Sequence, residues 1–101
     1  MRVSVENQQG KAVVKLDGRF DFNTHRDFRG GYEGALAQAD VREIVIDLGG
    51  VDYLDSSALG MLLMLRDKAL AGNKQVALIN CSGNVRQVLD IANFGKLFKI
   101  G

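Results

Sequence analysis

Residues 42–70 read REIVIDLGGVDYLDSSALGMLLMLRDKAL, and this stretch decides the fold class. It begins with a short β-branched apolar run, Arg42–Leu48, which ends in Gly49-Gly50 and is typical of a strand near the centre of a sheet. After a connector at 51–54, a run rich in leucine and methionine predicts a helix from about Ser56 to Leu70. The tripeptide AGN that follows is a stop signal for that helix.

The residues before this stretch predict a hairpin and another helix. Polar and apolar residues alternate at the start of the chain, the sequence NQQG follows as a turn, and a second apolar run is expected to stop at Asp17-Gly18. A helix is then expected to run to about Ala39, with Asn23 or Thr24 as its N-cap. Three glycines weaken that helix by about 1 kcal/mol each relative to alanine.

The residues after residue 72 predict a strand, a helix and a short final strand. Residues 75–79 form a fourth apolar run, Ser82 fits the N-cap of a third helix, and the sequence NFG at 93–95 breaks that helix. Residues 96–100 alternate well enough for a last strand. The apolar stripe assigned to the third helix consists of Val85, Val88, Leu89 and Ile91.

The order of these elements predicts an α/β protein. Strands and helices follow one another as ββαβαβα(β), and helical crossovers between strands imply parallel pairs beside the antiparallel hairpin. We therefore expect a mixed β-sheet of four to five strands with helices packed mainly on one face. A chain of 101 residues is expected to form a single domain over 1–101.

Composition excludes several classes of function. Hydrophobic residues make up 47% and charged residues 25% of the chain, as in an ordinary folded protein. Thirteen basic and twelve acidic residues give a net charge of +1 without a basic cluster, which argues against nucleic acid as a partner. Cys81 is the only cysteine, so no internal disulfide can form. With no secretory signal and no run of about 20 apolar residues, we expect a soluble cytoplasmic protein without membrane insertion.

Two hydroxyl groups lie at the predicted start of the central helix, in the sequence Asp55-Ser56-Ser57-Ala58-Leu59-Gly60. A phosphoryl group, with a charge of about −1.5 to −2, is tolerated there because the helix dipole is positive at this end. The alternative is that Asp55 and Ser56 are only caps, which is the commoner case from spacing alone. Gly60 costs a helix about 1 kcal/mol, so either a partner's backbone or an internal contact must approach it closely.

The string IVIDLGGVDYLDSSALG, residues 44–60, resembles the strand, loop and helix start of STAS-domain anti-sigma factor antagonists, which are single-domain bacterial partner-switching proteins. Upstream, LDGRFD at 16–21 is similar to that family's L-x-G-x-[LF]-D, and residues 85–100 resemble its last helix and hydrophobic ending. The resemblance implies a STAS-like mixed sheet. One departure is Ala58, at a position that is often glycine in the family.

The resemblance also implies a phosphorylation cycle in signal transduction and transcription regulation. The unphosphorylated protein would bind an anti-sigma factor or a serine kinase-like regulator, a partner kinase would phosphorylate Ser56, and a PP2C-type phosphatase would reset it. The chain would be a substrate rather than an enzyme, would need no cofactor or metal, and would form at most a weak homodimer. The partner-binding residues implied are Asp21, Asp55, Ser57, Ala58, Leu59, Gly60 and Met61.

Other functions have less support in the sequence. His25, the sole histidine, has no other metal ligands around it and is expected on the surface. Cys81 has no CxxC partner and is expected to be a buried structural thiol. Neither a G-x-S-x-G elbow nor a phosphate-binding P-loop is present. The alternative within the same fold is an unphosphorylated accessory subunit that docks on a transporter ATPase, which would need the helix surface but not the Ser56 hydroxyl.

Overall fold

The computed structural model describes all residues, 1–101, and contains five strands and three helices in the expected order. Two short 3-10 turns, η1 and η2, precede α1 and β5. The elements are β1 (Arg2–Gln8), β2 (Lys11–Phe20), η1 (Phe22–Thr24), α1 (His25–Ala37), β3 (Glu43–Leu54), α2 (Ser56–Ala71), β4 (Gln75–Ile79), α3 (Gly83–Ile91), η2 (Phe94–Lys96) and β5 (Lys99–Ile100).

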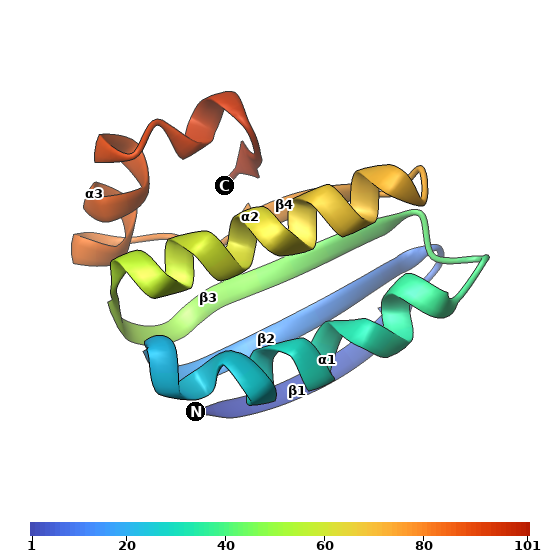
Figure 1. The fold of residues 1–101 in the computed structure, drawn as a ribbon, viewed down its shortest axis with the longest axis horizontal. Coiled ribbons are helices and arrows are strands. Elements are labelled where there is room, and N and C mark those ends of the chain that lie inside the picture. The colour runs from blue at the N-terminus through green and yellow to red at the C-terminus, as the bar shows by residue number, and fades with distance from the viewer.

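The sheet is mixed, as expected, and its strands lie in the order β1-β2-β3-β4-β5. β1 and β2 form an antiparallel hairpin, whose turn residues Gln9 and Gly10 both have positive φ. Every later pair is parallel. Figure 1 shows α1 and α2 side by side on one face of this sheet, and α3 and η2 beyond the β4 side. The prediction of helices mainly on one face is therefore confirmed.

The core lies between the sheet and these helices. Ile44, Ile46 and Leu48 alternate along β3 on the covered face and are almost completely buried. From the helix side, Phe28 of α1 packs against Phe20 of β2 with ring centroids 4.9 Å apart. Other large side chains are also almost completely buried in this core: Val14, Leu16, Tyr32, Leu62, Leu65, Leu78 and Leu89.

Two strands are longer than the sequence predicts. β2 does not stop at Asp17-Gly18 but continues to Phe20, and β3 continues through Gly49-Gly50 and the expected connector to Leu54. The glycines mark irregular pairing rather than strand ends, because the β2–β3 register shifts beside Gly18, which has a φ of +106°. A Cβ on Gly50 would lie 2.9 Å from the Leu16 carbonyl oxygen, so a side chain there would push the strands apart.

The helix boundaries also differ in part. Thr24, one of the two expected N-caps, holds the N-cap position of α1, although its side chain makes no capping hydrogen bond there; Asp21 caps the preceding η1. α1 ends at Ala37 rather than near Ala39. Ser82 lies at the N-cap position of α3 but its side chain makes no capping hydrogen bond. Ile91, placed on the buried stripe of the third helix by its spacing, is 82% exposed because the helical period turns it away from the face of α3 that buries Val85 and Leu89.

The last strand is shorter than predicted. Asn93 adopts left-handed backbone geometry with a φ of +60°, and η2 takes up Phe94–Lys96, so that β5 is reduced to Lys99–Ile100.

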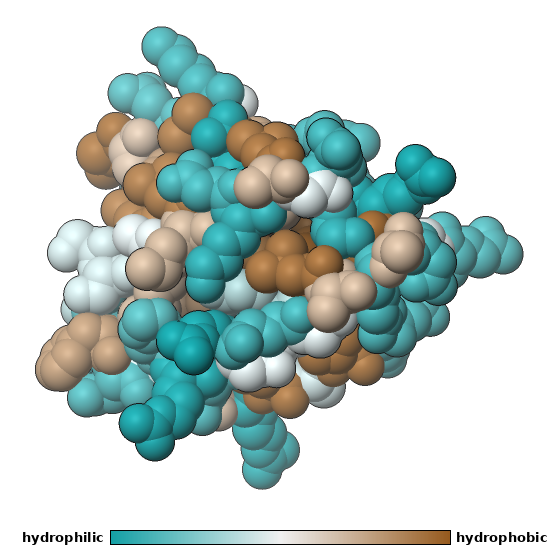
Figure 2. Space-filling model, turned by 45° about the vertical axis from the view of Figure 1, so that its right-hand side comes forward, coloured by the Kyte–Doolittle hydropathy of each residue, from teal (hydrophilic) through white to brown (hydrophobic).

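Large apolar side chains also reach the surface. Figure 2 shows several separate apolar areas between polar side chains on the face drawn, rather than one continuous patch. The large hydrophobic residues exposed on the whole molecule are Val5, Phe22, Tyr53, Met64, Leu70, Ile91 and Leu97. Scattered apolar residues are usual on a protein surface, so only those with a second unusual feature need an explanation.

Gly31 should be required by the fold, whereas Gly34 should not. A Cβ on Gly31 would lie 2.5 Å from Cγ1 of Val3, whereas a Cβ on Gly34 would meet nothing within 4 Å. Gly31→Leu should therefore lower the free energy of unfolding by about 1–3 kcal/mol through overpacking. Gly34→Leu, the control, should be neutral or stabilising because leucine is the better helix former. Urea unfolding midpoints measure both; equal effects of the two variants would contradict the close packing of α1 on β1.

Candidate partner-binding site

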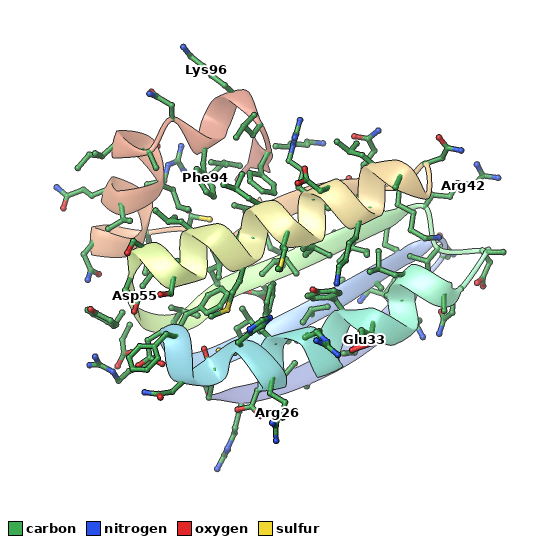
Figure 3. The ribbon with its side chains drawn as sticks, in the orientation of Figure 1. Arg26, Glu33, Arg42, Asp55, Phe94 and Lys96 are labelled. Carbon is green, nitrogen blue, oxygen red and sulfur yellow. The ribbon has the colours of Figure 1, made fainter.

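The predicted site forms where β2 and β3 end side by side. Their parallel pairing continues to Phe20 and Leu54, and the amide of Asp55 then donates a hydrogen bond to the Phe20 carbonyl oxygen at 3.3 Å. The loop before α1 and the start of α2 are therefore brought to the same edge of the sheet, as expected for parallel strands. Figure 3 shows Asp55 at the start of α2, at the same end of the molecule as the start of α1.

Asp55 is the N-cap of α2. Its backbone is extended, and its Oδ1 accepts a hydrogen bond from the amide of Ala58 at 3.0 Å, which satisfies one of the free N–H groups at the helix start. Ser56 and Ser57 follow in the first turn, and both are exposed. No acidic residue lies within that first turn, and the carboxylate of Asp55 at the N-cap lies at the positive end of the helix dipole, directly before the two serines.

Asp21 has a similar role in the neighbouring loop. Its Oδ1 accepts a hydrogen bond from the Asn23 amide at 3.0 Å, and Thr24 completes a capping box with it. Its Oδ2 lies 3.5 Å from Nε of Arg19. The guanidinium of Arg19 in turn lies over the ring of Tyr53, 4.1 Å from the centroid, as a cation–π contact between the ends of β2 and β3. Both aspartates thus fix the two loops.

The other residues implied by the resemblance divide between surface and core. Ser57 and Gly60 are exposed and Leu59 is partly buried, whereas Ala58 and Met61 are buried against the sheet. The helical period explains the division, because residues three apart lie on the same face of α2. The side chains of Ala58 and Met61 are therefore not accessible to a partner in this structure. They pack α2 onto the sheet beneath the exposed serines.

Sequence reasoning missed two exposed aromatic residues at this end of the molecule. Phe22 is 69% exposed in η1, and Tyr53 is 38% exposed near the end of β3. No local pattern marks Phe22, because Phe20 also lies between two polar residues, Arg19 and Asp21, and is fully buried.

Alternative sites lack the necessary groups. His25 is exposed at the start of α1, and no cluster of three or more His, Cys, Asp or Glu side chains could hold a metal ion. Cys81 is buried, and burial raises the pKa of its thiol, which makes the reactive thiolate scarcer. None of the helices is both long and apolar enough to cross a membrane.

Comparison with known proteins matches residues 3–99 to the family described as "Mlab, STAS domain". The chain belongs to the STAS domain family. A STAS-domain containing protein of Pseudomonas aeruginosa is 53% identical over 88 residues, which cover 87% of this chain and 85% of the relative. An anti-sigma F factor antagonist of Lysinibacillus sphaericus is 31% identical over 85 residues, covering 82% of this chain and 71% of the relative.

Solved STAS structures share the fold. The anti-sigma factor antagonist SpoIIAA in its unphosphorylated form superposes with a TM-score of 0.76 at 22% identity, covering 99% of this chain and 87% of that one. The Bacillus SpoIIAA structure in the phosphorylated form gives a TM-score of 0.74, also at 22% identity, covering 99% and 91%. The expected α/β STAS architecture is therefore confirmed.

The Asp55 cap should contribute measurably to stability. Asp55→Ala removes the acceptor for the Ala58 amide and should lower the free energy of unfolding by about 0.5–2 kcal/mol. Asp55→Asn should retain most of that stability, because asparagine caps helices about as well as aspartate. Urea unfolding of the three proteins gives the comparison. Equal losses in both variants would mean that the charge of Asp55, and not its hydrogen bond, stabilises the start of α2.

Proposed function

We propose that this STAS protein is an anti-sigma factor antagonist controlled by phosphorylation of Ser56. The observation that supports the proposal most directly is an exposed serine hydroxyl in the first turn of α2, immediately after the capping Asp55. The names of two similar proteins, the Lysinibacillus antagonist and SpoIIAA, point to the same role, and SpoIIAA is described in both unphosphorylated and phosphorylated forms.

In the proposed cycle the protein acts stoichiometrically rather than as an enzyme. The unphosphorylated form binds an anti-sigma factor or a related kinase-like regulator. The partner kinase transfers the γ-phosphoryl group of ATP to Oγ of Ser56, and ADP and the hydroxyl proton leave. A PP2C-type phosphatase then hydrolyses the phosphate ester with water, which restores the hydroxyl and releases inorganic phosphate.

Phosphorylation would act locally. A phosphate of charge about −1.5 to −2 on Ser56 would stand on an exposed surface that the partner must cover, beside Asp55 and next to the loop that holds Asp21. The positive end of the α2 dipole would stabilise the same phosphate, so the domain itself should stay folded. Removing only about 2.8 kcal/mol from binding weakens affinity about a hundredfold, which is sufficient for a switch.

Substitutions at Ser56 should separate binding from folding. Ser56→Ala should bind the partner permanently, whereas Ser56→Asp should bind about a hundredfold more weakly, with both melting curves close to wild type. The partner is obtained by co-purification with Ser56→Ala from the native bacterium, identified by mass spectrometry, expressed, and titrated calorimetrically. Ser57→Ala is the matched control: its intact mass should still shift on phosphorylation, and treatment with phosphatase should reverse the shift.

Two results would count against this function. If phosphate persists in Ser56→Ala and disappears in Ser57→Ala, the modified residue is the wrong serine. If Ser56→Ala, Ser56→Asp and the phosphorylated protein bind the partner equally, the switch is absent and the transporter accessory subunit becomes the better description.

A further inference from the structure

The exposed side of the first half of α2 carries no charged group and has no partner in the structure. The ten residues from Ser56 to Leu65 include no charged side chain, and apolar residues lie on every side of the helix. Helices that are apolar all round are normally buried all round. Here the inner side is buried by the sheet, but Met64 is 46% exposed, and Leu59 and Leu63 are only partly covered.

Gly60 lies on this open side and has no function in the fold that its surroundings reveal. It is exposed, and a Cβ built on it would meet nothing within 4 Å. The contrast with Gly31 and Gly50 is direct, because a Cβ on either of those would collide with a neighbouring strand. A close internal contact, one of the two explanations for Gly60 left open by the sequence, is therefore absent. Close approach from outside the molecule remains.

The position of Gly60 distinguishes it from other open helical glycines. Gly34 of α1 is equally unobstructed, but it follows Glu33, which is paired with Arg29 on a charged helix surface. Gly60 instead lies one helical turn after Ser56 and one turn before Met64 on the same side of α2. The free space is therefore next to the proposed phosphorylation site, within the uncharged strip formed by Ser56, Gly60 and Met64.

We propose that the partner of the unphosphorylated protein packs an uncharged, apolar helix across α2 at Gly60, with its backbone close to the Gly60 Cα. This inference rests on the proposed function and specifies how the partner binds. The strip from Ser56 to Met64 is about 12 Å long, which matches the 10–12 Å width of one crossing helix. A charged residue at the crossing would lose its hydration without finding an opposite charge, because Ser56–Leu65 offers none.

This geometry explains how a small modification could release a whole helix. The distance between packed helices is set by the side chains at their contact, and it is shortest where one of them is glycine. A phosphate on Ser56, one turn from the crossing, would stand in the space that the close approach requires. It would also have to be dehydrated against an apolar surface, which strongly disfavours a charged group.

The test uses a substitution that should stabilise the protein while weakening binding. Gly60→Ala adds a methyl group in open space and replaces glycine by a better helix former, so the urea unfolding midpoint should rise. Its affinity for the purified protein that co-purifies with Ser56→Ala should fall at least tenfold. Gly60→Leu should weaken binding further. Gly34→Ala, the matched control, should raise the unfolding midpoint in the same way and leave affinity within twofold of wild type.

Each contrary outcome has a distinct meaning. If Gly60→Ala binds within twofold of wild type while Ser56→Asp loses the partner, the helix crossing is wrong and the proposed function stands. If Ser56→Asp and Ser56→Ala bind equally while Gly60→Ala loses the partner, the binding surface is supported and the switch is wrong. A lower unfolding midpoint for Gly60→Ala would assign the glycine to folding and overturn the inference. Sedimentation showing a dimer that Gly60→Ala dissociates would also overturn it, because the occupant would be a second copy.

Discussion

The hydrogen bond from the Asp55 amide to the Phe20 carbonyl oxygen completes the parallel pairing of β2 with β3, and the position of the whole site depends on that pairing. The pairing brings the loop after β2 and the loop after β3, which are more than thirty residues apart in sequence, to one edge of the sheet. Each loop is then fixed by an aspartate that caps the element after it. The exposed serines consequently project from the capped first turn of α2 at this edge of the sheet.

The sequence was sufficient to predict the elements whose patterns are local. The β-branched run at 44–46 and the leucine-rich run after Ser56 gave β3 and α2 because short-range periodicity determines both. The extensions of β2 and β3 could not be predicted, because a glycine such as Gly50 is usually a signal that a strand ends. Only the structure shows that Gly50 lies inside the strand, close to the Leu16 carbonyl oxygen of the neighbouring strand. The burial of Ala58 and Met61, which the resemblance implies as partner-binding residues, could not be predicted either, because it depends on how α2 is rotated on the sheet.

Lys74 is a further feature that composition alone does not reveal. Its side chain is only 6% exposed, and its ammonium group donates hydrogen bonds to the carbonyl oxygens of Gln38 and Val41. These carbonyls belong to the segment between α1 and β3, at the end of the sheet opposite the serines, and a lysine is rarely buried unless its charge has such acceptors. The buried ammonium group thereby joins the start of β4 to the segment before β3, at the end of the molecule away from the serines.

The unequal lengths of the strands have a consequence for local motion. β3 pairs with β4 only over Glu43–Asp47, so the remainder of β3, up to Leu54, is hydrogen-bonded in the sheet to β2 alone. A two-stranded ribbon opens more readily than the interior of a wider sheet, and backbone amides there exchange with solvent sooner. Ser56 therefore follows the half of β3 that is hydrogen-bonded to a neighbouring strand on one side only. In the proposed cycle, a kinase that draws Ser56 into its cleft would displace a short ribbon and leave the hydrogen-bonded centre of the domain undisturbed.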